Sequence, residues 1–189
     1  MGQKLNVRNN NALILGIVIG AIVLGIAIVA FLVLTSSSTN KDLGSYVPQE
    51  QRIPNEGRSH VATGTKVNYK HNPPASGPHW PSPANWGIYK EQVPTEAWVH
   101  NLEHGGIVVL YNCRQNCREV QNQLEDLYNS IPPDPVFSEK KILITPYPSL
   151  QTSFAALAWD YYLPMESLDN QLVLRFYREH INKGPELVP

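Results

Sequence analysis

The stretch VHNLEHGGIVVLY, residues 99–111, contains two histidines four positions apart, His100 and His104, with a carboxylate between them. If this stretch is helical, both imidazoles lie on one face and can bind one metal ion. HNLEH also satisfies the H-x-x-E-H pattern of inverted zinc peptidases, in which the glutamate, here Glu103, serves as base. Because Gly105 and Gly106 follow at once, we expect at most one or two turns of helix, which argues against a peptidase.

A second segment that carries a histidine is NPPASGPHW, residues 72–80, which three prolines make rigid. It places His79 beside Trp80, and a rigid loop holds a metal ligand well. Metal-free interpretations also fit each motif alone. The proline-rich turn can pack an aromatic ring, and an isolated pair of histidines can bond a carbonyl or solvent.

Several motifs together resemble the uncharacterised domain-of-unknown-function family 3105, whose members often lie behind a single membrane anchor. They are HVATGTKVNYKHNPPASGPHW, WGIY, VHNLEHGGIVVLY, ITPYP, AWD and GPE, and they extend from about His60 to Glu186. The resemblance implies the fold and the anchored arrangement but no activity. The histidines that match its pattern are His60, His79, His100 and His104. His71 and His180 do not clearly belong to it.

We therefore predict one copper or zinc ion per domain, bound by those four histidines. Glu103 is expected behind them, accepting an imidazole N–H and fixing its tautomer. Four protein ligands would close the site, which favours storage, delivery or structure over hydrolysis, because a hydrolytic metal needs an open position. The less favoured alternatives are an enzyme, either a zinc hydrolase with Glu103 as base or a thiol redox protein, and a metal-free scaffold module.

The two cysteines, Cys113 and Cys117, lie where a strand is expected to feed a helix, and a helix N-terminus can lower a thiol pKa. An extended chain from Gly105 to Asn112, at about 3.3 Å per residue, puts His104 roughly 23 Å from them. One metal ion therefore cannot take both sets of ligands. We expect a local, structural disulfide, and a redox pair or a second metal site are the alternatives.

Residues 12–34 contain no charge and no proline. At about 1.5 Å per residue a helix there spans roughly 35 Å, enough to cross a hydrocarbon core of about 30 Å. We expect an uncleaved transmembrane helix, because FLVLTSSS offers no small-residue cleavage site. Lys4 and Arg8 precede it, so residues 1–11 are expected in the cytoplasm and the chain after residue 34 on the outer side of the cell membrane.

The partners that the sequence predicts are few. The formal net charge is −1 and no basic stripe is present, which argues against nucleic acid. Membrane lipid would surround residues 12–34, where Gly16 and Gly20 form a G-x-x-x-G that would allow a homodimer. The sequence names neither a metal donor nor an acceptor.

Residues 35–59 are polar and contain helix breakers, which predicts a flexible tether, and residues 60–189 are expected to form a single small α+β domain. Helices are expected after Cys117 and from about Ser167. Strands are expected at 66–69, 87–89, 107–111, 141–145 and 154–159. The core order is then strand, helix, strand, strand, helix with one right-handed crossover, and a thioredoxin-like arrangement would fit it.

Overall fold

The computed structural model describes residue 25, residues 50–113, residue 115 and residues 117–189. The described residues from Glu50 onward belong to one compact unit. The predicted transmembrane helix lies outside the described residues except for Gly25, and so does the tether as far as residue 49. Within the described part of the chain, no helix is long and apolar enough to cross a membrane.

A mixed sheet forms the middle layer of this unit, with the strand order β1-β6-β5-β3-β4-β2. Its strands are β1 (Gln51–Arg52), β2 (Gly87–Ile88), β3 (Ile107–Tyr111), β4 (Ile142–Pro146), β5 (Phe154–Ala158) and β6 (Tyr161–Met165). β3 pairs in parallel with β4 and antiparallel with β5, and β5 and β6 form an antiparallel pair. The parallel pair requires a crossover between β3 and β4, which contains a helix.

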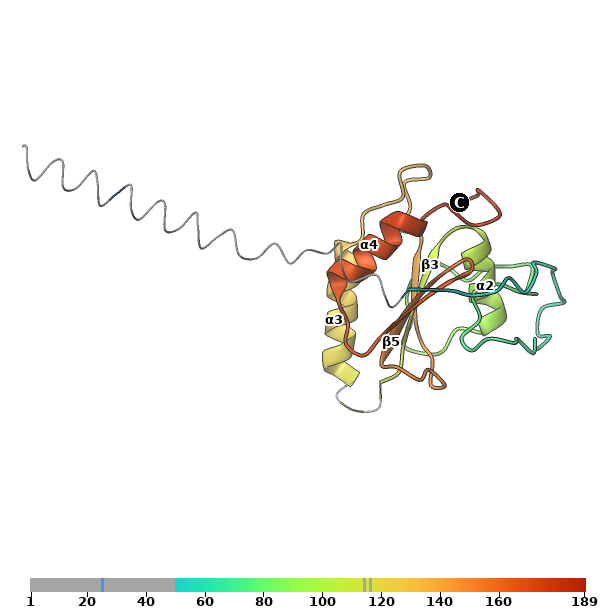
Figure 1. Cartoon of the computed structure of the whole chain (residues 1–189), viewed down its shortest axis with the longest axis horizontal. Coiled ribbons are helices and arrows are strands. Elements are labelled where there is room, and N and C mark those ends of the chain that lie inside the picture. The colour runs from blue at the N-terminus through green and yellow to red at the C-terminus, as the bar shows by residue number, and fades with distance from the viewer. Residues whose placement is uncertain (1–24, 26–49, 114, 116) are drawn as a thin grey trace, which may run out of the picture. The chain divides into compact units, whose positions relative to one another are not determined.

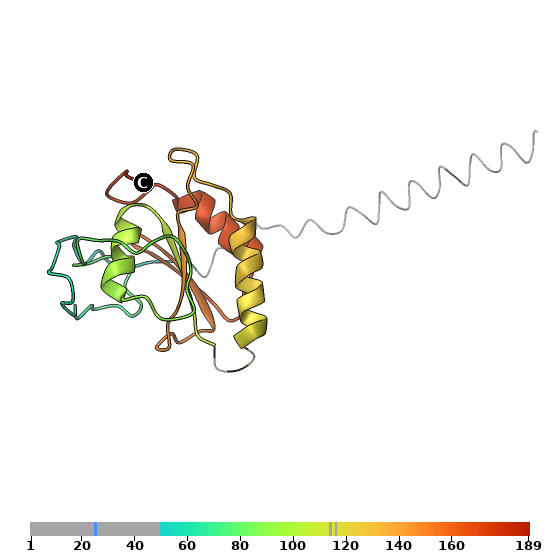
Figure 2. The same cartoon turned by 180° about the vertical axis from the view of Figure 1, so that it is seen from behind.

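Helices cover both faces of the sheet (Figures 1 and 2). α2 (Thr95–Glu103) lies on one face, while α3 (Cys117–Ser130) and α4 (Asn170–His180) lie on the other. β3 is buried along its whole length, with Ile107 and Val109 in the cluster under α3 and α4, and Val108 and Leu110 in the cluster under α2. This burial on both sides explains why β3 reads as a continuous apolar run.

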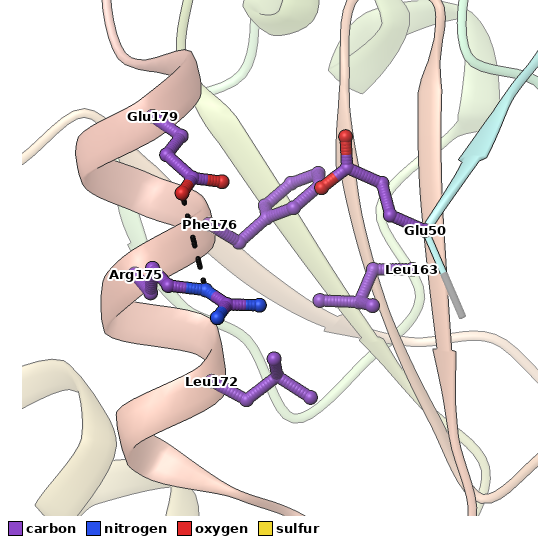
Figure 3. Close-up of a pocket in the computed structure, with 6 residues that line it drawn as sticks. All are labelled: Glu50, Leu163, Leu172, Arg175, Phe176 and Glu179. Carbon is purple, nitrogen blue, oxygen red and sulfur yellow. Dashed lines mark ion pairs between the residues drawn. The ribbon is translucent and has the colours of Figure 1, made fainter. Parts of the chain in front are cut away.

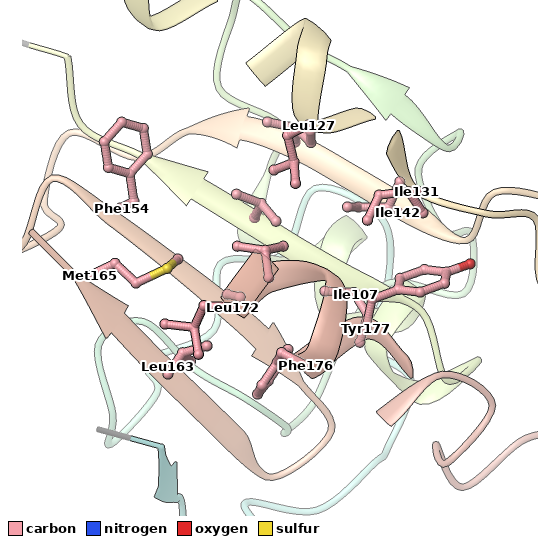
Figure 4. Packing of buried hydrophobic residues seen from close by; sticks show 14 of the residues in the cluster. Ile107, Leu127, Ile131, Ile142, Phe154, Leu163, Met165, Leu172, Phe176 and Tyr177 are labelled. Carbon is pink, nitrogen blue, oxygen red and sulfur yellow. The ribbon is translucent and has the colours of Figure 1, made fainter. Parts of the chain in front are cut away.

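The cluster under α3 and α4 is the larger of the two and fixes both helices on the sheet. Leu127 of α3 and Phe176 and Tyr177 of α4 pack against side chains of β3 and β4, such as Ile107 and Ile142 (Figure 4). The chain thus holds β3 rigidly between two apolar layers. The chain segments at both ends of β3, before Ile107 and after Tyr111, are therefore held in fixed positions.

The α+β class predicted from the sequence is confirmed, and two strands, β1 and β6, were not predicted. β6 follows β5 directly, so the core order is strand, helix, strand, strand, strand, helix. Its sequence YYLPM contains Pro164, and a proline inside an apolar run argues against a strand. The last helix begins at Asn170 rather than near Ser167, because the Asp169 side chain accepts N–H bonds from Gln171 and Leu172.

Three local predictions are corrected. Residues 66–69 form no strand, because Val67 N–H donates to the Glu96 carboxylate and Tyr69 OH to the Pro78 carbonyl instead of to a neighbouring strand. α2 is longer than the one or two turns expected, since it begins at Thr95, directly after Pro94. The last part of the supposed tether belongs to the domain, because β1 pairs with β6 and Ile53 N–H donates to Asp160 O.

Candidate metal centre

Two of the four predicted histidines come from loops that pair with each other. His60 and His79 form an isolated parallel bridge, in which His79 N–H donates to Ser59 O at 3.0 Å and Val61 N–H donates to His79 O at 2.8 Å. The His79 side chain is fully buried, whereas that of His60 is 49 % exposed. The bridge therefore holds one buried and one accessible imidazole side by side.

The other two histidines lie at the end of α2. His100, Glu103 and His104 are three and four positions apart, so they share one face of the helix. The helix ends at His104 through a pair of backbone bonds, Gly105 N–H to Leu102 O and Gly106 N–H to Asn101 O. This is a Schellman motif, and Gly105 takes the positive φ of 73° that the motif requires.

Lys141 and the chain beyond α4 hold this end of α2 in place. Glu186 N–H donates to Glu103 O at 3.0 Å, and the fully buried Lys141 donates from Nζ to His104 O at 2.5 Å and to Val188 O at 2.7 Å. The last carbonyls of a helix have no partner within the helix, so these donors satisfy them. Figure 1 shows the C-terminal segment lying next to the end of α2.

Four side chains from these elements converge. Ligand atoms of His60, His79, His100 and Glu103 all lie within 4.8 Å of one another. Glu103 Oε2 is 2.9 Å from His79 Nε2 and 3.8 Å from His60 Nε2. His79, His100 and Glu103 are at most 4 % exposed. We call this group the histidine cluster; it offers three imidazoles and one carboxylate to one point.

The outward nitrogens of the buried histidines are bonded to main-chain oxygens. His79 Nδ1 lies 2.8 Å from Gly77 O, and His100 Nδ1 lies 2.7 Å from Trp80 O. A carbonyl oxygen can only accept, so each Nδ1 carries the proton. In a neutral imidazole the Nε2 atom then carries a lone pair, and both Nε2 atoms face the interior of the histidine cluster.

His104, the remaining predicted ligand, lies outside the group of four. Its Nε2 is 2.9 Å from His100 Nε2, and its Nδ1 is 3.2 Å from the main-chain oxygen of Pro189. The carboxylate of Glu186 approaches the same Nε2 to 3.9 Å. The structure thus brings three of the four predicted histidines together, with Glu103 among them and His104 beside His100.

Burial keeps the histidines of α2 neutral. Desolvation lowers the pKa of His100 to about 4, and the neighbouring His104, His79 and His60 add to that effect, while the bond to Trp80 O opposes it. Desolvation also lowers the pKa of His104, against the opposing influence of Pro189 O and Glu186. Neutral imidazole is the form that binds a metal ion.

A second group of ligand-type side chains lies between β1 and α4. It consists of Glu50, Glu179 and His180, next to a hollow that Arg175 also lines (Figure 3). Arg175 Nε lies 3.9 Å from Glu179 Oε1, and His180 Nε2 lies 3.2 Å from Glu50 Oε1. A guanidinium already supplies positive charge there, so we assign no metal ion to this group.

The two cysteines are joined in a disulfide, as predicted, with a Cα–Cα distance of 5.5 Å. The disulfide follows the C-terminal end of β3, whereas the histidine cluster lies before its N-terminal end. The two sites are therefore separate, as the length of β3 required. Two cavities lie beside the disulfide, lined in part by Cys113.

Sequence reasoning missed two features of the site. Lys141 and the residues after α4 were not assigned to it, although GPE at 184–186 was among the family motifs. Lys141 gave no signal, because a lysine at the start of a strand is normally exposed. Glu103, which was expected to accept an imidazole N–H, has Oε2 at 2.9 Å from His79 Nε2 and belongs to the group of four.

Comparison with known proteins gives one finding. The family described as "Protein of unknown function (DUF3105)" matches residues 60–188, which is more than half of the chain. Neither the curated proteins nor the solved structures give a match. The match covers the bridge of His60 and His79 and α2, which together form the histidine cluster, and nearly all of the C-terminal segment that contacts α2. The chain therefore belongs to the DUF3105 family of proteins of unknown function.

Proposed function

We propose that the domain binds one divalent zinc or copper ion in the histidine cluster. The ligands are Nε2 of His60, His79 and His100 and a carboxylate oxygen of Glu103. The main support for this proposal is that Nδ1 of His79 and Nδ1 of His100 each bond a main-chain oxygen. Histidines that bind metals almost always donate their second ring N–H in this way, which fixes the tautomer and aims the other nitrogen at the ion.

The close contacts inside the cluster support a cation at this point. His79 Nε2 and Glu103 Oε2 are 2.9 Å apart, as are His100 Nε2 and His104 Nε2. With its proton on Nδ1 and a neutral ring, His79 sets an Nε2 electron pair against the Glu103 carboxylate in the first contact. An ion bound to both atoms removes this conflict.

Three imidazoles and one carboxylate form a donor set of intermediate hardness. Imidazole suits zinc, copper, iron and nickel, whereas carboxylate oxygen is a harder ligand and adds a negative charge. We therefore favour Zn²⁺ or Cu²⁺ over Cu⁺, which prefers thiolate and thioether. Glu103 is taken as the fourth ligand rather than His104, because only Glu103 reaches all three other donors.

The position of the ion favours exchange with solvent, hence storage or delivery. Three ligands are buried and preorganised, but His60 is half exposed and belongs to a loop. An imidazole that can swing away from the ion opens one coordination position without disturbing the other three. A purely structural ion is expected to be enclosed on all sides.

The alternative functions fit this geometry less well. A hydrolase requires Glu103 to accept a proton from water, but its Oε2 already contacts His79. A metal-free scaffold would need a proton in place of the ion between His79 Nε2 and Glu103 Oε2. Both alternatives are distinguished from metal binding by a titration.

The test is calorimetric titration of the metal-stripped full chain with Zn²⁺ and with Cu²⁺. We expect one ion per chain. His79→Asn and His100→Asn keep a donor in the place of Nδ1 and remove Nε2, so they should weaken binding by more than the roughly 10–100-fold typical of an indirect partner. His71→Asn is the matched control, since His71 bonds Glu56 through Nδ1 and lies outside the cluster. Equal affinities of the three variants would contradict the proposal.

Two finer statements about the whole chain are also proposals. We propose that residues 12–34 anchor the domain on the outer side of the cell membrane, on the strength of their apolar sequence and of Lys4 and Arg8 before them. We also propose a thioredoxin-like arrangement for the part from β3 to α4. The strand order β6-β5-β3-β4 and the α3 crossover support it.

A further inference from the structure

The disulfide between Cys113 and Cys117 occupies a position that suits reactive thiols. Cys113 follows β3 after one intervening residue, and Cys117 is the first residue of α3, a helix of 14 residues. The N-terminus of such a helix carries partial positive charge and stabilises a thiolate that forms there. Glu119 in the first turn is the one acidic residue of that turn and offsets this effect only in part.

The disulfide is accessible from outside. Cys117 is exposed, whereas Cys113 is half-buried and packs against the apolar cluster under α3 and α4. A cavity of about 530 Å³ is lined by Cys113, and a second cavity of about 200 Å³ is lined by both cysteines. Inert structural cysteines are buried, so this exposure points to a bond that reacts.

The larger cavity has walls that suit a polypeptide. Besides Cys113 it is lined by hydroxyl, amide and apolar residues and by one acidic residue: Thr152, Ser153, Asn112, Gln115, Gln151, Val120, Phe154 and Glu166. Asn112 holds this wall in place, because its N–H donates to Ser153 O at 2.8 Å and its side-chain amide donates to Leu150 O at 3.0 Å. Uncharged amides and hydroxyls can both donate to and accept from a peptide backbone.

As a cross-link the bond is expected to stabilise the fold at the low end of the usual range of about 2–4 kcal/mol. A disulfide stabilises mainly by closing a loop in the unfolded chain, and this one closes a loop of only three intervening residues. The sheet and both helices around it are already held by the apolar cluster. A purely structural role therefore leaves its accessible position unexplained.

We propose that Cys113 and Cys117 exchange electrons with cysteine thiols presented on a polypeptide. A substrate thiolate attacks Sγ of the exposed Cys117, the Cys113–Cys117 bond breaks, and its electron pair leaves on Cys113 Sγ. A second substrate thiolate then attacks the substrate sulfur of the mixed disulfide and releases Cys117. Two electrons and two protons pass from the substrate dithiol to the pair, and the substrate leaves as a disulfide.

The first test uses the full chain, stripped of metal with a chelator and oxidised. It is equilibrated in buffers of graded reduced and oxidised glutathione, and its free thiols are alkylated and counted by mass spectrometry. We expect the pair to become reduced within this series while circular dichroism and zinc titration stay unchanged. Persistence of the disulfide throughout the series, or reduction only together with loss of the fold, would overturn the proposal.

The second test identifies the attacked sulfur and the substrate class. Cys113→Ser retains Cys117, and Cys117→Ser retains Cys113; each is mixed with a peptide disulfide and with oxidised glutathione. We expect Cys113→Ser to form the mixed disulfide with the peptide at least about tenfold faster than Cys117→Ser. Equal rates for the two variants would overturn the assignment of Cys117. Equal rates for peptide and glutathione would overturn the polypeptide substrate.

Discussion

At the scale of single residues, the protonated nitrogens of the histidine cluster determine what it can bind. His79 and His100 donate their Nδ1–H groups to Gly77 O and Trp80 O, so only Nε2 of each ring remains to bind a metal ion. Glu103 stands among these nitrogens rather than behind them. Its role as a ligand can be measured directly, because a carboxamide keeps its shape and removes its charge.

Glu103→Gln is expected to weaken zinc binding by more than the roughly 100-fold upper range of an indirect partner. The matched control is Glu96→Gln, a change at an equally buried glutamate of the same helix that bonds Val67 N–H and Lys66 instead. Competition titration with a chromogenic chelator measures both affinities. A loss of only 10–100-fold for Glu103→Gln would return Glu103 to the role first expected from the sequence.

The depressed pKa of His100 predicts how stability depends on pH in the metal-free chain. The pKa is about 4 in the folded state against 6.5 ordinarily, so the unfolded chain binds more protons between these values. The part of the folding stability that depends on neutral His100 is therefore fully present above pH 6.5 and is lost as pH falls toward 4. Urea unfolding at pH 7 and pH 5 should show lower stability at pH 5, with a smaller difference in His100→Asn. An unchanged difference would assign the effect to other groups.

At the scale of elements, the end of α2 is built by contacts that are distant in the sequence. Gly184 lies so close to α2 that an added Cβ would come within 2.7 Å of Leu102 O and would overlap Glu103 O and Gly105 N. These atoms are main chain and cannot move aside without shifting Glu103. The C-terminal segment can therefore pack this closely against the end of α2 only because residue 184 is a glycine.

Gly184→Ala is expected to destabilise the fold by about 1–3 kcal/mol, as overpacking does, and to weaken metal binding. Lys183→Ala, an exposed neighbour, is the control. Urea unfolding and zinc titration of both variants measure the two effects. Zinc affinity equal to that of the parent would show that the segment does not position the ligands.

Lys141 is expected to act on the same end of α2 through its buried ammonium group. Lys141→Met removes the bonds to His104 O, Asn182 Oδ1 and Val188 O, which should lower the free energy of unfolding by about 3 kcal/mol. Lys140→Met serves as control, since the partly exposed Lys140 donates to Tyr128 O and Asn129 O, which belong to α3. Losses of equal size would mean that Lys141 has no special role.

The fold could be predicted where the sequence has one dominant periodicity, and not where tertiary contacts decide. β3 and the apolar stripes of α3 and α4 follow from local pattern alone. The length of α2 could not be predicted, because the helix is buried on several sides and carries Glu96, Asn101 and Glu103 as buried polar residues. The histidines were found through their types and motifs, but the place of Glu103 among them depends on a loop and a helix meeting in space.

At the scale of the whole molecule, the described unit places the histidine cluster and the disulfide at the two ends of β3. The histidine cluster precedes this strand and the disulfide follows it. The predicted anchor would hold both outside the cytoplasm, where disulfides persist. Protease added to intact cells that express the full chain should then degrade residues 60–189. Protection until the membrane is permeabilised would place the domain inside.

Anomalous X-ray diffraction from zinc-loaded crystals shows directly whether one metal ion binds in the histidine cluster. We expect a single strong peak at the zinc edge, about 2.0–2.2 Å from Nε2 of His60, His79 and His100 and from a carboxylate oxygen of Glu103. A peak at Glu50, Glu179 and His180, or no peak at any histidine, would contradict it.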